Sequence, residues 1–436
     1  MSRPRAAVVV TGTEVLGGWV TDVNGPWLAG RLGALGVEHV STTVVGDRPE
    51  DLRAALEHAR DRGFELVLTS GGLGPTEDDL TAQVVAEFAA RPAAVDPALE
   101  ERIWRIVEPM SKRWPDISLD AMREGCRKQA LVPAGAAVLE PVGTAPGLVV
   151  PPTDDDAGRP PTPTVVVLPG PPPELQPMWT AAEEHPLLRA AIADATALHE
   201  STVRLFGLPE SELAKTMRDA RGAGVAIDAF EITTCMRGGE LEVVSRWSAE
   251  HDADGRAFEA FLADRHGAAL YSPDGRTVDE LVLDGLRERG WSIGTAESCT
   301  GGLLAGRLTK LPGSSDVVEG GIVSYSNAVK ARSLGVDEAL LVAHGAVSAE
   351  VAAAMASGAR ERLGVDVGVS TTGIAGPGGG TPEKPVGLVF VAVEGPDGGL
   401  TRKLRLPGDR TRVRELTTTA ALHLVRRVLS GDHDAS

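Results

Sequence analysis

Long apolar segments are missing from this sequence of 436 residues. No apolar run approaches the roughly 20 residues that are needed to cross a bilayer. The run at residues 6–10 (AAVVV) is far too short for the core of a signal peptide. We therefore expect a cytoplasmic protein with no membrane partner.

Cysteine and positive charge are also scarce. The three cysteines, Cys126, Cys235 and Cys299, are far apart and odd in number, which argues against a disulfide framework and a thiolate metal site. The nine histidines show no metal-ligand spacing. Lys and Arg total 43 against 61 Asp and Glu, and the net charge of −18 repels a phosphate backbone. We expect no nucleic-acid partner.

Lysine and tyrosine are the rarest informative residues. Only 7 of the 43 basic residues are Lys, and the chain has two Tyr. Apolar residues make up 42% of the chain, which is enough to build buried cores for two or three domains. A lysine or tyrosine in a loop of unusual composition is therefore a candidate for a specific role.

The hydrophobic pattern divides the chain into three parts. Residues 1–172 alternate strand-like runs (8–10, 64–68 and 165–168) with helical stretches such as 51–60, and this βαβ pattern predicts an α/β domain. The proline-rich tract 151–164 is interpreted as a surface insertion.

Residues 173–272 predict a small α+β domain. The pattern there favours a helix over 175–192, strands at 202–205 and 241–247, a short helix after Pro209 and a helix over 257–266.

Residues 273–436 predict a second α/β domain. Thr277 and Glu280 have the spacing of a capping box, which starts a helix. Strand signals follow at 291–295, 321–325, 365–370 and 386–393, with helical segments at 303–311, 349–363 and 413–429.

Three loops in this last part follow predicted strands, where open α/β sheets usually bind ligands. The first, residues 296–302 (AESCTGG), places Ser298 at a turn into a helix whose first N–H groups can bind an anion. The second, residues 320–330 (GGIVSYSNAVK), holds Tyr325 and Lys330. The third, residues 371–387 (TTGIAGPGGGTPEKPVG), is rich in glycine and holds Lys384.

A nucleophilic serine needs a base, and the histidines of this part, His344, His423 and His433, lie outside the three loops. A lysine whose pKa is lowered can accept the seryl proton, whereas arginine stays protonated. Ser298, Lys330 and Tyr325 therefore fit an amidohydrolase. Cys299 is a rival nucleophile, although most lone cysteines are inert packing groups.

The first domain has its own glycine-rich loop, SGGLGPTEDDLT at residues 70–81. Gly71, Gly72 and Gly74 let the backbone approach a phosphate closely. The spacing leaves two interpretations of Asp78 and Asp79 open. In one they begin a helix, and in the other they hold a divalent cation beside the phosphate.

The three loops of the last part, with LPGSSDVVEGG (311–321) and GAVSAEVAAAMASGAR (345–360), resemble the carboxy-terminal domain of the CinA family of competence/damage-inducible proteins, the nicotinamide mononucleotide deamidases. The resemblance implies hydrolysis of nicotinamide mononucleotide to nicotinate mononucleotide and ammonia, without a cofactor. It implies Ser298 as nucleophile, Lys330 as general base, and Tyr325 as the group that orients or relays the proton.

Further residues of these loops are expected to bind the substrate. Backbone N–H groups from Cys299 to Gly302 can stabilise the oxyanion, and the loop 373–380 with Lys384 can hold the 5′-phosphate. The substrate-binding candidates are Thr300, Gly301, Gly302, Thr372, Gly373, Gly378 and Lys384.

The segments VVGD (44–47), GTAPG (143–147) and LPGPPPEL (168–175), with the glycine loop, resemble the amino-terminal domain of the same family, which is similar to the molybdopterin-binding MogA and MoeA domains. This implies a three-layer α/β fold that binds a pterin phosphate or, in some relatives, cleaves ADP-ribose with a divalent metal. Asp47 and Asp79 match its acidic, metal-binding positions. The tract 151–164 is longer than expected for the family, and Pro173 replaces a common serine.

The resemblance also places a KH-type domain at 173–272 and implies a homodimer. No GxxG loop appears in that middle region, so we expect it to pack and space its neighbours rather than clamp nucleic acid. Two other functions stay open: a non-catalytic scaffold that binds molybdopterin or a nucleotide, and a competence factor that acts on DNA, which the net charge disfavours.

Overall fold

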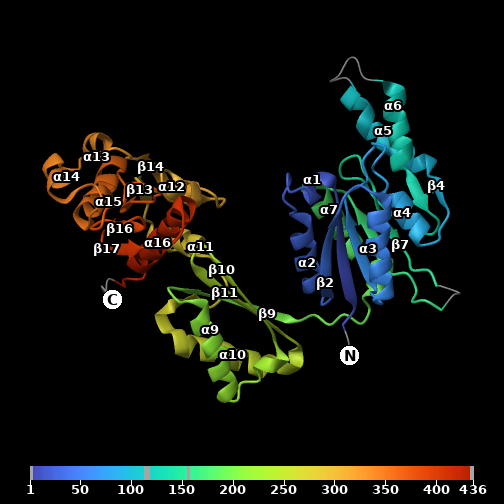
Figure 1. Cartoon of the computed structure of the whole chain (residues 1–436), viewed down its shortest axis with the longest axis horizontal. Coiled ribbons are helices and arrows are strands. Elements are labelled where there is room, and N and C mark those ends of the chain that lie inside the picture. Colours follow the sequence, from blue (N-terminus) through green and yellow to red (C-terminus); the bar gives the residue numbers. More distant parts are fainter. Residues whose placement is uncertain (1–2, 112–117, 155–157, 433–436) are drawn as a thin grey trace. The chain divides into compact units, whose positions relative to one another are not determined.

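The computed structural model describes residues 3–111, 118–154 and 158–432, and the chain divides into two compact units, Met1–Leu198 and His199–Ser436 (Figure 1). His433 and residues 155–157 of the proline-rich tract lie outside the described residues. In the described part, no helix is both long and apolar enough to cross a membrane.

Unit 1 is built on a six-stranded sheet with the order β2-β1-β3-β8-β7-β6. The four strands β2, β1, β3 and β8 are parallel, and β7 and β6 are antiparallel to their neighbours. The strands are β1 (Arg5–Thr11), β2 (Glu38–Val45), β3 (Leu66–Ser70), β6 (Ala137–Leu139), β7 (Gly147–Val150) and β8 (Thr164–Leu168). The central strands are buried on both faces, as parallel strands between helical layers require.

Helices cover both faces of this sheet. One face packs against α2 (Asn24–Ala34), α7 (Pro172–Glu183) and α8 (Pro186–Ala191), and the other against α3 (Pro49–Asp61) and α4 (Thr81–Phe88). Beside them lie the short helix α1 (Thr13–Leu16), the pair β4 (Ala93–Val95) and β5 (Leu131–Pro133), and the helices α5 (Pro97–Ser111) and α6 (Leu119–Gln129). This confirms the predicted three-layer α/β fold.

The first unit extends beyond the predicted boundary at 172/173. Leu175, Trp179 and Leu188 of α7 and α8 are buried in the same core as Val8 of β1, so both helices belong to unit 1. The single helix predicted over 175–192 is wrong, because Pro186 begins a second helix after a break at Glu184 and His185.

Unit 2 begins with a four-stranded antiparallel sheet of the order β10-β11-β9-β12. Its strands are β9 (His199–Phe206), β10 (Glu231–Arg237), β11 (Glu240–Trp247) and β12 (Leu270–Ser272), and its helices are α9 (Glu210–Gly222) and α10 (Asp252–His266). The two helices share a core with the sheet through Leu213, Phe258 and Leu205. The helix after Pro209, predicted to be short, has 13 residues.

A five-stranded sheet of the order β14-β13-β15-β16-β17 forms the rest of unit 2. Its strands are β13 (Ile293–Glu297), β14 (Val318–Val323), β15 (Val367–Gly373), β16 (Leu388–Gly395) and β17 (Gly398–Arg405). Its helices are α11 (Val278–Arg289), α12 (Leu303–Leu308), α13 (Asn327–Leu334), α14 (Glu338–His344), α15 (Ala349–Leu363) and α16 (Arg410–Leu429).

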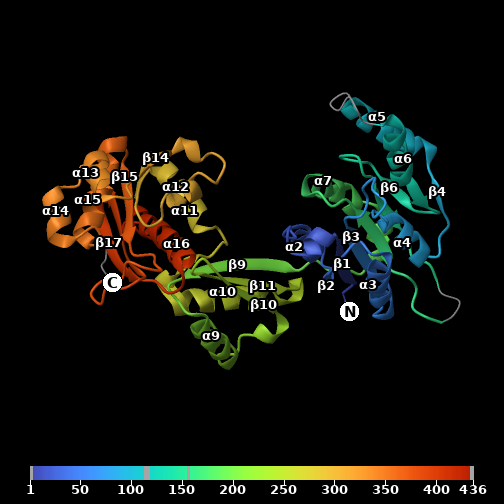
Figure 2. The same ribbon diagram turned by 45° about the horizontal axis from the view of Figure 1, so that its top comes forward.

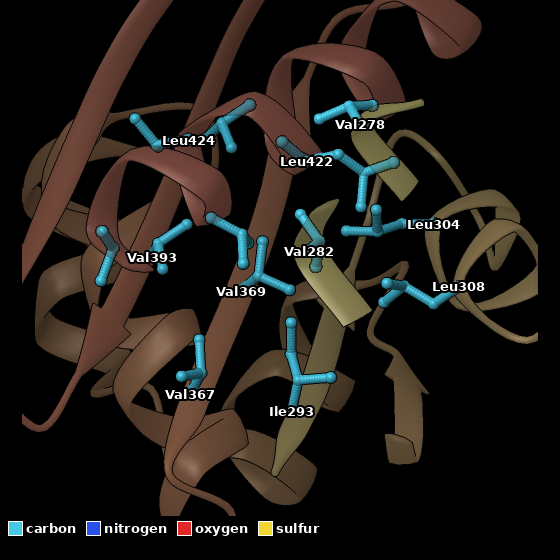
Figure 3. Close-up of a cluster of buried hydrophobic side chains, with 14 of the residues drawn as sticks. Val278, Val282, Ile293, Leu304, Leu308, Val367, Val369, Val393, Leu422 and Leu424 are labelled. Carbon is cyan, nitrogen blue, oxygen red and sulfur yellow. The ribbon is translucent and has the colours of Figure 1, made fainter. Parts of the chain in front are cut away.

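Alternate residues of this sheet face two helical layers, with α15 on one side and α16 on the other (Figure 2). Figure 3 shows part of the larger core, in which Ile293 and Val369 of the sheet belong to the same buried cluster as Leu422 of α16. Both the predicted capping box of Thr277 with Glu280 and the predicted helix at 349–363 are confirmed.

Candidate active site

Three parallel strands end together at the site. In the order β14-β13-β15 the central strand is β13, and its carboxyl end leads directly to Ser298. The Ser298 amide N–H donates to the carbonyl of Thr371 on β15 (2.9 Å), and the Ser324 amide after β14 donates to the carbonyl of Glu297 (2.8 Å). The strand pairing therefore continues past the sheet and brings the first two loops against the end of β15.

Lys330 and Ser298 are in hydrogen-bonding contact. Lys330 lies on α13, which Ser326 caps, and its side chain returns to the end of β13. Its Nζ lies 3.0 Å from Ser298 Oγ and 2.7 Å from the carbonyl oxygen of Ser324. Lys330 is only 1% exposed, and this burial lowers the pKa of its amine below the ordinary value.

A buried amine beside a serine hydroxyl has the chemistry of a general base. The neutral form of Lys330 carries a lone pair that can accept the Ser298 proton, and desolvation increases the share of that form. By contrast, burial raises the pKa of the Cys299 thiol to about 11, which holds it protonated at neutral pH. Of the two candidate nucleophiles, the geometry favours Ser298.

Within the part of the chain that the structure describes, Tyr325 makes no hydrogen bond to Ser298 or Lys330. Its side chain is 61% exposed, and its hydroxyl accepts a hydrogen bond from Arg410 Nη2 (3.0 Å). A direct proton relay between Tyr325 and Lys330 is therefore absent from this arrangement, and the Tyr325 side chain lies at the surface.

The amino terminus of α12 is already occupied by an internal carboxylate. Glu297, which is 1% exposed, accepts hydrogen bonds from the N–H groups of Gly302 (2.9 Å), Leu304 (3.0 Å) and Ala305 (2.8 Å). These amides were expected to be free for an anion, and they are not. The amides of Cys299, Thr300 and Gly301 remain as candidate donors to an oxyanion.

The other predicted substrate-binding residues have mixed environments. Thr300 and Thr372 are both buried. The Thr300 hydroxyl bonds to Thr371 Oγ1 (2.7 Å), and the Thr372 hydroxyl donates to the carbonyl of Ala346 (2.7 Å). Lys384 Nζ donates to the carbonyls of His344 and Val347, both at 2.8 Å. Gly301 and Gly302 have positive φ in the turn after Ser298, Gly373 ends β15, and Gly378 lies in the open part of the third loop.

Two arginines that the sequence analysis missed join the three loops. Arg414 donates to the carbonyls of Cys299 (3.2 Å) and Thr300 (2.7 Å), and Arg410 donates to the carbonyl of Gly376 (3.0 Å) as well as to Tyr325. Both lie in the first turns of α16, four residues apart and hence on one helix face. In the sequence, this role is indicated by two arginines that lie four residues apart directly after a loop.

The predicted acidic and glycine residues of unit 1 line one cavity of about 320 Å³, namely Asp47, Gly71, Gly72, Gly74, Asp78 and Asp79. Gly71 has a φ of +107°, and a Cβ there would lie 2.5 Å from the carbonyl oxygen of Thr11, so this position requires glycine. Helix α4 begins at Thr81, after both aspartates, so Asp78 and Asp79 do not begin it.

The two candidate metal ligands already accept hydrogen bonds within the protein, Asp47 from the start of α1 and Asp79 from its own loop. The carboxylate of Asp47 accepts from the N–H (2.9 Å) and hydroxyl (2.8 Å) of Thr13, and that of Asp79 accepts from the N–H of Thr76 (3.0 Å). Across the described ranges, no group of three or more His, Cys, Asp or Glu side chains is arranged to hold a metal ion. Asp47 and Asp79 nevertheless lie along one cavity, and Mg²⁺ needs only one or two carboxylates when a substrate phosphate completes its shell.

Fold and site together define an α/β protein with a buried serine–lysine pair at the strand ends of its second unit. Residues 275–429 match the family described as "CinA C-terminal domain", and residues 7–190 match the "Probable molybdopterin binding domain". The "CinA-like protein" of Mycolicibacterium gilvum is 55% identical over 431 residues, covering 98% of this chain and 99% of that protein. The chain belongs to the family of CinA-like proteins.

A second relative that matches nearly the full chain agrees with this assignment. The "CinA-like protein" of Mycobacterium tuberculosis is 52% identical over 431 residues and covers 98% of each chain. A crystal structure of the competence/damage inducible protein CihA from Agrobacterium tumefaciens is 43% identical; the match covers 35% of this chain and 95% of that one, with a TM-score of 0.34.

Proposed function

We propose that this protein deamidates nicotinamide mononucleotide to nicotinate mononucleotide and ammonia. The observation that carries the proposal is the 3.0 Å contact between Lys330 Nζ and Ser298 Oγ in a buried setting. A serine that is activated in this way attacks an amide carbonyl, and the flat pyridine carboxamide is the substrate class that the family resemblance implies.

The reaction follows acyl transfer. The neutral amine of Lys330 takes the hydroxyl proton as Ser298 Oγ bonds to the carboxamide carbon, and the proton then passes to the departing NH₂ group, which leaves as ammonia. Water hydrolyses the seryl ester by the reverse proton path. The amides of Cys299, Thr300 and Gly301 are our candidate donors to the oxyanion, and each such donor contributes about 3 kcal/mol to lowering a barrier of this kind.

The substrate phosphate needs a cation at the rim of the site. We assign this role to Arg410 together with the loop 373–380, because Arg410 lies at the surface and bonds to both Tyr325 and Gly376. Lys384 is a weaker candidate than the sequence suggested, since two of the three donors of its ammonium group are directed to backbone carbonyls.

Ammonia release from nicotinamide mononucleotide tests the proposal. Ser298→Ala should lower kcat by at least about 10³-fold, because the nucleophile is removed while the fold is kept. Cys299→Ser is the matched control, and it should stay within about threefold of the wild-type rate. A Ser298→Ala protein with wild-type turnover would contradict the assignment, and no ammonia from micromolar wild-type enzyme would favour a binding scaffold.

For unit 1 we propose hydrolysis of ADP-ribose with a divalent cation as a second activity. Five of the residues that line its cavity are acidic (Glu14, Asp47, Asp78, Asp79 and Glu174), and none of the described lining residues is basic. A pyrophosphate can enter such a site only with a cation, which Asp47 and Asp79 would hold. Release of AMP from ADP-ribose with Mg²⁺, and its loss in Asp47→Asn, would support this; equal rates with and without the cation would refute it.

A further inference from the structure

A separate cavity of about 590 Å³ lies in unit 2, away from the serine–lysine pair. It opens between the strands β9 and β12 on one side and β16, β17 and the last turns of α16 on the other. Its volume is typical of a small-molecule site. Apolar side chains form much of its wall, among them Leu270, Val391, Leu404 and Leu424.

The charge of this cavity is opposite to that of the whole chain. Three arginines line it, Arg402, Arg426 and Arg427, against one aspartate, Asp432. Asp432 is engaged by Arg427 through two hydrogen bonds, of 2.8 and 3.1 Å. In a protein with a net charge of −18, a concentration of positive charge beside apolar residues indicates a preference for an anion.

Arg426 differs from the other two arginines in its hydrogen bonding. Within the described ranges it has no hydrogen bond or ion pair, and its Nε is buried without an acceptor. Its guanidinium lies over the Tyr271 ring, 5.5 Å from the centroid, instead of turning to the carbonyls at the end of α16. A partly buried guanidinium without a hydrogen-bond acceptor is stabilised by an anionic ligand.

The aromatic residues of the cavity are held in fixed positions. The rings of Phe206 and His423 stack at a centroid distance of 3.7 Å, and Tyr271 meets His423 edge-on at 4.5 Å. Glu240 holds both His423 Nε2 (2.9 Å) and the Tyr271 hydroxyl (2.5 Å). Rigid aromatic walls favour a ligand with a flat aromatic body.

We propose that this cavity binds a small aromatic anion, with the negative group on Arg426 and the ring system against Tyr271 and the apolar wall. The ligand class is an aromatic carboxylate, sulfonate or phosphate ester. The site is independent of the deamidase proposal, because none of its lining residues belongs to the three loops around Ser298.

Calorimetric titration of the full-length chain with naphthalene-1-sulfonate tests the site. We expect one molecule to bind per chain, and the uncharged naphthalene-1-sulfonamide to bind at least tenfold more weakly. Arg426→Gln should weaken the sulfonate at least tenfold and leave the sulfonamide nearly unchanged. Arg289→Gln is the matched control, since Arg289 also ends a helix and lies over a ring, that of Trp291, outside the cavity.

Ala420→Phe provides a second variant in case Arg426→Gln unfolds. Ala420 lines the cavity on α16, and a larger side chain there should abolish binding of both compounds. The proposal is overturned if the sulfonate fails to bind at millimolar concentration, if both compounds bind equally well, or if folded Arg426→Gln and Ala420→Phe proteins keep wild-type affinity. The last result would locate the probe at another surface.

Discussion

The amine of Lys330 is buried and has neutral hydrogen-bond partners. Its two hydrogen-bond partners, Ser298 Oγ and the Ser324 carbonyl, are neutral, and among the described residues no carboxylate pairs with its amine. A buried ammonium group without a counter-ion is destabilised, so the pKa falls and the uncharged base becomes available at a lower pH than it does for an exposed lysine. Arginine could not replace it, since a guanidinium stays protonated.

The pH dependence of the deamidase should report this ionisation. We expect kcat/KM to rise with pH, with a slope up to about one, and to level off at a pKa below the ordinary lysine value of 10.5. Lys330→Arg should lose at least about 10³-fold in kcat at every pH. Thermal unfolding of the variant serves as the control, and retention of the wild-type profile by Lys330→Arg would contradict the base assignment.

The same lowered pKa has a stability consequence of definite sign. Between the folded pKa of Lys330 and 10.5, the unfolded chain binds more protons than the folded chain, so the free energy of unfolding rises with pH in that window. Lys330→Met keeps the apolar stem and removes the titrating group. We expect its stability curve, measured by urea unfolding, to be flatter in this window; an unchanged slope would show that Lys330 is not the titrating group.

Tyr325 and Arg410 should act as a pair. Their 3.0 Å hydrogen bond implies that Tyr325→Phe and Arg410→Gln remove the same contact, so their effects on KM should be non-additive by about 0.5–1.5 kcal/mol. Kinetics of the two single variants and the double variant measure this coupling. Strict additivity would mean that the two side chains act on the substrate separately.

For single residues, loop composition was enough to identify Ser298 and Lys330 as catalytic candidates, because lysine is rare in this chain and Lys330 lies in a loop close to a strand-end serine. It was not enough for Glu297, Arg410 and Arg414. Glu297 contacts amides only 5 to 8 residues away, but sequence spacing does not determine the direction of its side chain. The contacts of Arg410 and Arg414 join loops that are distant in sequence, and only the fold brings those loops to α16. The relay predicted for Tyr325 assumed a direction for its side chain that sequence spacing does not determine.

At the element scale, two glycines in the second unit have opposite roles. Gly358 lies on α15, where a Cβ would meet the carbonyl oxygen of Leu334 at 2.1 Å, so the helix can approach α13 only through glycine. Gly306 lies on α12, where a Cβ would have no neighbour within 4 Å. The first glycine is required by packing, and the second only lowers helix propensity.

Alanine substitutions should separate these roles. We expect Gly358→Ala to lower the free energy of unfolding by about 1–3 kcal/mol through overpacking, and Gly306→Ala to raise it by about 0.5–1 kcal/mol through helix propensity. Urea unfolding of both variants checks the two signs. Equal effects would show that the close approach of α15 to α13 is not a constraint.

Hydrophobic periodicity predicted the buried strands β1, β3 and β8 and the helices α15 and α16, and it missed the buried strand β7 and the long helix α5. It also missed β2, β10 and β17. All three are edge strands with many exposed polar positions, so their sequences lack a continuous apolar run. The turn between β10 and β11 gave a usable signal, because Gly238 and Gly239 both adopt positive φ, as a tight hairpin requires.

For the chain as a whole, the fold class was predictable, whereas the end of the first unit was not. The first unit ends at Leu198 because α7 and α8 complete its core, although their sequence follows a proline-rich loop that resembles a linker. The predicted division at 272/273 falls within a unit that stays compact from His199 to Ser436. Contacts of Glu240 and Tyr271 with His423 cross that position, and no local sequence pattern encodes them.

These contacts predict how the second unit should respond to truncation. A fragment of residues 199–436 contains every group that the serine–lysine pair contacts, so it should deamidate nicotinamide mononucleotide within about threefold of the full chain. A fragment of residues 273–436 keeps the pair but lacks Phe206, Glu240 and Tyr271, which cover His423 on α16. Uncovering that face exposes apolar surface, and burial of such surface stabilises by about 25 cal/mol per Å².

We therefore expect the shorter fragment to unfold at a lower urea concentration than the longer one. Its free energy of unfolding should be lower by several kcal/mol, while its KM for the substrate stays the same. His423→Gln in the longer fragment is the matched control, because it perturbs the same contact without removing the antiparallel sheet. If both fragments unfold at the same urea concentration, the contacts around His423 contribute nothing to stability, and the boundary predicted at 272/273 would describe two independent folding units.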